Sequence, residues 1–388
     1  MKALVTTLLL ALLLSGCSWF RGTGETSEPS APVPSPSSIK SEIKLKTLWS
    51  IDVGSEGPET IYRLRPAVGP KYVYVADYAG VVRAVDKSTG RTVWSTDVKN
   101  PVSAGPGLGK GIVTVGTRTG EVIALNAATG RILWYSGATS EVLAVPAVAD
   151  GIVVARAADG RVFGLDASNG HRIWISEYAV PSLTLRGTSD PVVAGDSVYV
   201  GLASGKVAAL RLKDGKEEWE ATVAVPKGRS DLERMVDVDA DPVVRGGGVF
   251  AVSYQGRLVA IGQSSGRVVW TRDVSAYTGL AVDRSNVYVT DADNQVWAFD
   301  AYRGASVWRQ NKLAGLHLSG PVVDGDYVVV GDNQGYLDWL SIRDGSLAGR
   351  LYVADGAIAQ PPVLSGGILY VLTQSGTLSA LKVGAASK

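Results

Sequence analysis

The sequence predicts an all-β protein, folded as an eight-bladed β-propeller with four-stranded antiparallel blades, and three observations support this. A unit of about 40 residues occurs in eight copies, the first beginning at Gly80. Each copy holds short runs rich in Val, Ile, Leu and Tyr between Gly and Asp turns, with no helical periodicity. The last copy is incomplete, and the segment that it lacks lies ahead of the first copy.

The clearest part of the repeat runs from a Gly through a Gly-containing turn to a Trp. A matching stretch, such as residues 191–204, precedes each copy, so each unit supplies four strands, which is one blade. Asn294 replaces the first Gly in one copy, which is consistent because Asn tolerates positive φ better than most residues. The copies occupy residues 80–94, 120–134, 160–174, 205–219, 256–270, 294–308, 335–349 and, truncated, 376–384.

The two ends of the repeat region are predicted to pair in one blade. The eighth copy stops near Gly384, before the outer strand that should end in Trp. Residues 46–49, which end in Trp49, precede the first full copy and supply that strand. We therefore expect a closed propeller over residues 45–384, followed by a short tail at 385–388.

The outer strands carry a repeated Trp. The pattern Ala-x-Asp-x-x-Thr-Gly-x-x-x-Trp, complete at residues 84–94, resembles the tryptophan-docking repeat of pyrroloquinoline-quinone propellers. The resemblance implies that each indole packs beside a small third-strand residue and against a neighbouring blade. The seventh copy inverts the pattern, and we expect Trp339 to fill the space that Gly349 leaves. The structural tryptophans are Trp49, Trp94, Trp134, Trp174, Trp219, Trp270 and Trp308.

The N-terminal segment is predicted to be a lipoprotein signal peptide, residues 1–16. A basic start and an apolar run too short to span a membrane indicate secretion. Leu-Ser-Gly before Cys17 resembles the bacterial lipobox, which implies that Cys17 is diacylated; an ordinary signal peptide with a stray Cys is the alternative. Because no Asp follows Cys17, the resemblance implies a periplasm-facing protein anchored in the outer membrane. Residues 17–44, rich in Pro and Ser, form a flexible tether.

The composition argues against several functions. With 38 basic and 37 acidic residues, the chain has a net charge of +1, which argues against nucleic-acid binding and against electrostatic membrane binding. His171 and His317 lack metal-site spacing, and we assign no metal, cofactor or catalytic residue. The glycines of segment 105–111 are attributed to turns, because the segment lacks the spacing of a phosphate loop.

The propeller resemblance leaves two further functions open, a quinone- or ligand-binding carrier and a quinone dehydrogenase. Relatives that bind the quinone use a calcium ion, a catalytic Asp and commonly a vicinal disulfide. Cys17 is the only cysteine of this chain, so it has no pair to form that disulfide. The repeat aspartates, among them Asp86, Asp166 and Asp300, are expected to shape turns.

Two connections exceed the needs of the repeat, and function in repeat proteins usually lies in such loops. The connections Trp174 to Pro191 and Trp219 to Pro242 are longer than, for example, Trp134 to Pro146. Both join an outer strand to the next inner strand, so they are expected on one face of the ring. They carry leucines and Met235 beside charged residues, a composition typical of protein interfaces.

The lipobox, the tether, the docking repeats and the Leu-Thr-Leu-Arg and Asp-Val-Asp motifs of these loops together resemble the BamB family of outer-membrane β-barrel assembly lipoproteins. The resemblance covers essentially the whole chain. It implies a non-enzymatic scaffold that assists folding and insertion of β-barrel proteins and docks to a POTRA domain of BamA. Contact with unfolded outer-membrane proteins and docking by an added β-strand are left open. The partner-binding residues that it implies are Leu183, Leu185, Arg186, Asp237 and Asp239.

Overall fold

The computed structural model describes residues 43–54, 57 and 62–384. The predicted signal peptide, Cys17, nearly all of the predicted tether and the tail at 385–388 lie outside these residues. No helix in the described part of the chain is long and apolar enough to cross a membrane.

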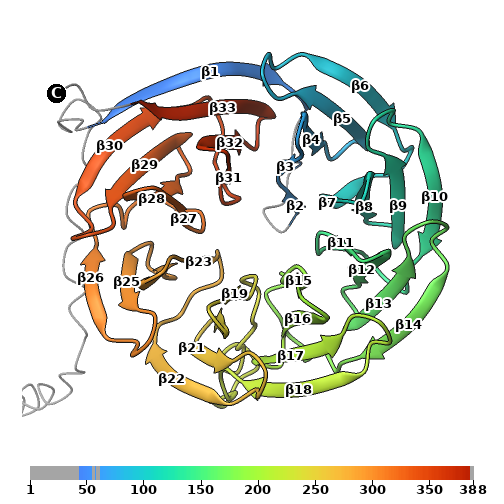
Figure 1. Ribbon diagram of the computed structural model, residues 1–388. Coiled ribbons are helices and arrows are strands. Elements are labelled where there is room, and N and C mark those ends of the chain that lie inside the picture. Colours follow the sequence, from blue (N-terminus) through green and yellow to red (C-terminus); the bar gives the residue numbers. More distant parts are fainter. Residues whose placement is uncertain (1–42, 55–56, 58–61, 385–388) are drawn as a thin grey trace, which may run out of the picture.

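Eight β-sheets form a ring, which confirms the predicted eight-bladed propeller (Figure 1). Blade 1 contains β3 (Ala67–Val68), β4 (Tyr72–Ala76), β5 (Val81–Asp86) and β6 (Thr92–Asp97); blade 2 contains β7 (Val102–Gly109), β8 (Ile112–Thr117), β9 (Glu121–Asn126) and β10 (Ile132–Gly137). Blade 3 contains β11 (Ala147–Ala149), β12 (Ile152–Arg156), β13 (Arg161–Asp166) and β14 (Arg172–Glu177); blade 4 contains β15 (Val192–Ala194), β16 (Ser197–Leu202), β17 (Lys206–Arg211) and β18 (Glu217–Thr222).

The second half of the ring repeats this plan. Blade 5 contains β19 (Val243–Arg245), β20 (Gly248–Val252), β21 (Arg257–Gly262) and β22 (Val268–Asp273); blade 6 contains β23 (Leu280–Val282), β24 (Asn286–Thr290), β25 (Val296–Asp300) and β26 (Ser306–Gln310). Blade 7 contains β27 (Val322–Asp324), β28 (Tyr327–Gly331), β29 (Tyr336–Ser341) and β30 (Leu347–Tyr352); blade 8 contains β31 (Val363–Ser365), β32 (Ile368–Leu372), β33 (Thr377–Gly384) and β1 (Lys44–Asp52).

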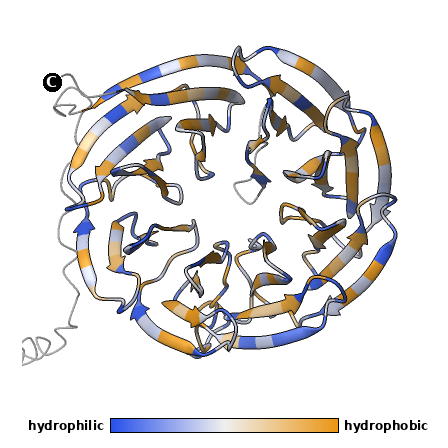
Figure 2. Ribbon diagram, viewed as in Figure 1, coloured by the Kyte–Doolittle hydropathy of each residue, from blue (hydrophilic) through white to orange (hydrophobic). Residues whose placement is uncertain are grey.

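The core lies between blades, where the middle strands pack face to face. Every residue of β8 is buried, whereas β14 buries Trp174 and exposes Ile173 and Ile175 on its outward face. Figure 2 shows hydrophobic and hydrophilic residues alternating along the outer strands. This alternation follows from the pleat, because an outer strand has a neighbouring blade on only part of its surface.

The ring closes as predicted, by pairing of the two ends of the chain (Figure 1). Strand β1 runs antiparallel to β33, from Lys44 opposite Gly384 to Asp52 opposite Thr377. Trp49 lies opposite Ala380, the position that the other outer tryptophans take opposite Ala or Gly. The eighth blade is therefore built from both ends of the described chain.

The outer tryptophans join successive blades, as expected. Each indole covers a turn glycine of the next blade. An added Cβ at that glycine would collide with the indole, as at Gly90 beneath Trp49. Each Nε1 also donates a hydrogen bond of 2.8 to 3.0 Å to a backbone carbonyl of that turn. The donor and acceptor pairs are Trp49–Lys87, Trp94–Ala127, Trp134–Ala167, Trp174–Leu212, Trp219–Gln263, Trp270–Ala301 and Trp308–Ile342.

Blade 7 departs from this scheme because the next blade has no turn to receive an indole. In blade 8 the third and fourth strands, β33 and β1, come from opposite ends of the chain. Gly349 accordingly stands at the outer position, and its partner across the strands is Trp339. Trp339 is fully buried in a cluster with residues of blades 7 and 8, among them Val329, Ile358 and Leu369. The expected inward replacement of the indole is confirmed.

One strand was not predicted from the sequence. Strand β2 (Arg63–Leu64) pairs in parallel with the inner strand β7 and makes blade 2 five-stranded. It places Arg63 and Arg65 towards the middle of the ring, between blade 2 and the start of blade 1. These two side chains organise the site described below.

The turn interpretation of the Gly-rich segment is wrong for three of its glycines. Gly105, Gly107 and Gly109 lie within β7, and only Gly111 lies in a turn, with φ of 81°. A Cβ at Gly107 would collide with the carbonyl of Pro146 in the connection to blade 3. The glycines therefore allow two blades to approach closely near the centre of the ring.

Candidate functional site

The two long connections meet on one face of the ring. They comprise residues 178–191, between β14 and β15, and residues 223–242, between β18 and β19. The backbone N–H of Leu185 in the first loop donates to Oδ1 of Asp237 in the second, over 3.2 Å. The sequence predicted that the loops share a face, and the structure confirms it.

The exposed side chains among the expected contact residues all come from the first loop. Leu183 is 42% exposed, Leu185 is half-buried, and the guanidinium of Arg186 is exposed. Arg186 has a φ of 58°, and its N–H donates to Oγ1 of Thr184 over 3.1 Å. Its side chain makes a 3.1 Å ion pair with Glu141, in the connection between β10 and β11. Because ion pairs in contact with solvent contribute little, this pair adds little to stability.

Two of the five expected contact residues are not at the surface. Asp237 is 0% exposed and Asp239 is also buried, so neither carboxylate is presented to a partner. Burial raises the pKa of Asp237, and burial together with the Asp237 charge raises the pKa of Asp239 to about 7. The resemblance implied that the Asp-Val-Asp motif contacts the partner, but its local sequence does not reveal that both carboxylates are buried. Met235, expected beside them, is buried as well.

These aspartates instead shape the first loop from beneath. Asp237 accepts the N–H of Leu185, and the Asp239 carboxylate lies so close to Gly187 that a Cβ there would collide with it. Leu185 and Gly187 flank Arg186, the residue in the left-handed conformation. The conformation that exposes Leu183 and Arg186 is therefore set by the second loop.

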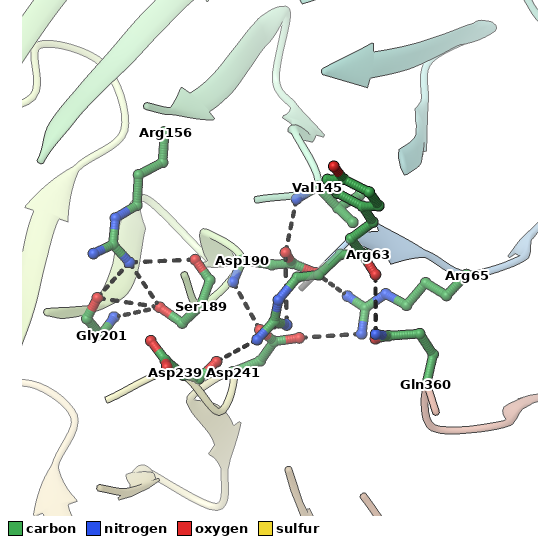
Figure 3. A network of polar contacts seen from close by, with 11 residues as sticks. Arg63, Arg65, Val145, Arg156, Ser189, Asp190, Gly201, Asp239, Asp241 and Gln360 are labelled. Atoms are coloured by element: carbon green, nitrogen blue, oxygen red, sulfur yellow. Dashed lines mark hydrogen bonds and ion pairs between the residues drawn. The ribbon is translucent and has the colours of Figure 1, made fainter. Parts of the chain in front are cut away.

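Beneath both loops lies a network of charged side chains (Figure 3). Asp190 ends the first loop and Asp241 lies near the end of the second; the two meet on Arg63 and Arg65. Arg65 pairs with Asp190 over 2.5 Å and with Asp241 over 3.1 Å. Arg63 pairs with Asp241 over 2.7 Å and donates a second hydrogen bond to the backbone carbonyl of Asp239.

The carboxylates of this network also receive backbone N–H groups. Oδ1 of Asp190 accepts the N–H of Val145, and Oδ1 of Asp241 accepts the N–H of Asp190, each over 2.7 Å. Burial, opposed by the two arginines, leaves the pKa of Asp190 raised to about 6. The network thus links the starts of blades 1, 3, 4 and 5.

A third arginine, which is buried, fixes the end of the first loop. Arg156 of β12 donates from Nη1 to Oγ of Ser189 over 3.1 Å and to the carbonyl of Gly201 in β16. Burial is the main cause that lowers the pKa of Arg156 to about 10. This contact holds residues 189–190 against blade 4 independently of β2.

The sequence contains a signal for this network. Arg65, Asp190 and Asp241 each stand immediately before the Pro that leads into an inner strand, at Pro66, Pro191 and Pro242. Equivalent positions of a repeat lie around the central axis of the ring. Opposite charges at one repeat position therefore predict side chains that meet at the centre.

A cavity of about 760 Å³ opens at the centre of this face. Its wall includes Arg63, Arg65, Asp241 and Leu185, so it borders both the network and the first loop. Tyr254, Tyr277, Leu280, Pro321 and Pro361 contribute apolar surface. In the described part of the chain, no group of three or more His, Cys, Asp or Glu side chains converges as a metal site.

Comparisons with known proteins agree on one family. A family model described as outer membrane protein assembly factor BamB matches residues 78–310. The BamB of Alkalilimnicola ehrlichii is 52% identical over 382 residues, covering 98% of this chain and 97% of that one. The crystal structure of BamB from Moraxella catarrhalis matches with a TM-score of 0.81 at 25% identity, covering 87% of this chain and 100% of that one. A quinohemoprotein alcohol dehydrogenase from Pseudomonas putida matches with a TM-score of 0.73 at 14% identity, covering 89% of this chain and 77% of its own, which shows a common fold. The chain belongs to the family of the outer membrane protein assembly factor BamB.

Proposed function

We propose that this protein is a non-enzymatic scaffold of outer-membrane β-barrel assembly that docks to a POTRA domain of BamA through Leu183, Leu185 and Arg186. The relative that is 52% identical over 98% of this chain is named an assembly factor, whereas the dehydrogenase, at 14% identity, shares only the fold. The observation that carries the docking site is an exposed Leu183 beside an exposed Arg186, on a loop held from beneath by buried carboxylates.

This arrangement suits a protein interface. Arginine is enriched among the residues that dominate binding energy, and exposed apolar side chains beside it add buried area, at lowest cost when both are already oriented. Asp237 and Asp239 orient the loop and do not touch the partner. Substitutions at these two buried positions would therefore weaken docking indirectly, through the position of Leu185 and Arg186.

Truncation of Arg186 tests the docking site. Arg186→Ala is expected to weaken binding to the POTRA domains of BamA by about thirtyfold, because a partner carboxylate or carbonyl loses its donor. Affinity is measured by calorimetry, and circular dichroism checks the fold. Arg161→Ala is the matched control, since Arg161 also pairs with an exposed glutamate, Glu177, over 2.9 Å but lies in blade 3's third strand. Equal affinities of the two variants would disprove the assigned surface.

The membrane attachment is proposed to be a lipid on Cys17. Two or three acyl chains hold a protein stably at a bilayer, where a single chain does not. The Pro/Ser-rich residues 17–44 then connect the lipid to β1 and leave the propeller in the periplasm.

Replacement of this cysteine tests the attachment. Cys17→Ala is expected to abolish incorporation of radiolabelled fatty acid and to release the protein from outer-membrane fractions, because no thiol is available for diacylation. Cell fractionation and labelling of wild type and variant provide the measurement. Labelling of the variant at the wild-type level would contradict a lipid on this residue.

A ligand-binding role is the second candidate, and the central cavity is the observation that favours it. Its volume of about 760 Å³ falls in the range of small-molecule sites. Its arginines are, however, already paired with Asp190 and Asp241, so they offer no uncompensated charge to a quinone carboxylate. Absorbance of the purified protein after addition of quinone and calcium distinguishes this candidate from the scaffold.

A further inference from the structure

We propose that Arg63 and Arg65 of the N-terminal segment are positioning residues for the docking surface, a role that rests on the proposed function and extends it. Neither side chain belongs to the loops that carry Leu183 and Arg186. Arg63, in β2, and Arg65, just after it, both contact the bases of these loops (Figure 3).

The contacts form a continuous path from β2 to the exposed residues. Arg63 holds the Asp239 backbone through its carbonyl and the neighbouring Asp241 through its carboxylate. The Asp239 side chain in turn packs against Gly187, next to Arg186. A displacement of the Asp239 backbone therefore moves the support on which the Arg186 conformation rests.

A second path runs through the end of the first loop. Arg65 bridges Asp190 and Asp241, and Asp190 donates its own N–H to Asp241. The planar guanidinium reaches one carboxylate with each terminal nitrogen, a geometry that a lysine or an apolar side chain cannot reproduce. Arg65 thus fixes the spacing between the ends of the two loops. Without it, the buried Asp190 would keep only the more distant cation of Arg63, at 3.8 Å.

We call the contacts of Arg63 and Arg65 with Asp190 and Asp241 the clamp. The position of β2 in the chain connects the clamp to closure of the ring. The preceding strand, β1, closes the ring, and Arg63 and Arg65 then hold the bases of the docking loops beside the central cavity. The two N-terminal strands therefore contribute both to ring closure and to the docking surface. A variant that alters β2 would change docking without touching any loop residue.

The test compares two arginines that each pair with buried or partly buried aspartate. Arg65→Met removes the clamp, while Arg83→Met breaks the 2.9 Å pair of Arg83 with Asp77 in blade 1, a pair that involves neither loop. Hydrogen–deuterium exchange of the full-length protein is followed in the peptide that contains the Leu185 amide, together with affinity for the POTRA domains of BamA. Arg65→Met is expected to accelerate exchange at Leu185 by about tenfold or more and to weaken binding by about tenfold. Arg83→Met should change neither.

Because Arg65→Met leaves Asp190 without its closest cation, Arg65→Met/Asp190→Asn is included to restore charge balance. The side-chain amide oxygen introduced by Asp190→Asn can still accept the Val145 N–H. This double variant should therefore keep the strand amides of blades 6 and 7 protected while Leu185 still exchanges fast. Leu185 exchange in the double variant at the rate seen in Arg83→Met would overturn the proposal. If wild type failed to bind the POTRA domains, the proposed function would fall, whereas the exchange comparison would still decide whether the clamp exists.

Discussion

Trp339→Ala is expected to lower the free energy of unfolding by about 3–5 kcal/mol, the range for removing a large aromatic side chain from a core. Trp339 is the largest fully buried side chain of the described chain. It packs against both blades 7 and 8, where the absence of an outer tryptophan leaves no second indole to share the contact. The cavity left by Trp339→Ala would therefore open beside the strands that close the ring.

Equilibrium denaturation in urea measures this effect, with Trp339→Phe as the conservative variant. Phenylalanine keeps much of the aromatic volume, so Trp339→Phe should lower the free energy of unfolding clearly less than Trp339→Ala does. A loss below about 1 kcal/mol for Trp339→Ala would show that the neighbouring blades collapse into the space. The inward indole would then have no role in holding the seam.

Arg350→Met is expected to have an effect of similar size, about 3–5 kcal/mol, because it leaves two buried carboxylates without their cation. The Arg350 side chain is 2% exposed, and it pairs with Asp332 over 2.5 Å and with Asp338 over 3.2 Å. Both carboxylates are 0% exposed. Burial raises the pKa of Asp338 to about 7 even while Arg350 is in place, so the charge on Asp338 is costly to bury.

Arg161→Met is the control for burial, measured by the same urea denaturation. Arg161 also pairs with two carboxylates, Asp159 over 2.7 Å and Glu177 over 2.9 Å, but in contact with solvent. Water replaces the lost partner there, so little change is expected. If the two variants lost equal stability, the effect of Arg350 would have to come from its packing over the Tyr336 ring rather than from its charge.

The repeat made most of the fold predictable, because its signals are local. Turn glycines such as Gly90 and outer tryptophans such as Trp94 recur at fixed spacing, and each has one structural role. Closure was predictable from the truncated eighth copy, since Trp49 had no other place in the pattern. The inverted pair of Trp339 and Gly349 was also visible, although its cause, the missing turn of blade 8, became clear only from the strand order.

The candidate site was predicted only in part, because its supporting contacts join segments that are distant in sequence. The two loops stood out by length, and Leu183 and Arg186 are exposed as expected. Strand β2 has two residues and no periodicity, so nothing local marked it. Asp237 and Asp239 are buried by packing with distant parts of the chain, and Arg63 and Arg156 oppose the rise that burial causes in the pKa of Asp239. A buried carboxyl group needs hydrogen bonds or a nearby cation, or else it takes up a proton, and such partners from distant segments are not visible in the local sequence.

The tryptophan contacts all run in one rotational direction, from each blade to the one that follows it. In the language of oligomers this is a heterologous contact, in which a donor surface meets a different acceptor surface. Such a contact carries no limit on the number of units, and it yields a ring only when the rotation per unit completes a full turn. The size of the propeller is thus set by the angle between blades. The indole contact supplies adhesion between neighbours and is the same whatever their number.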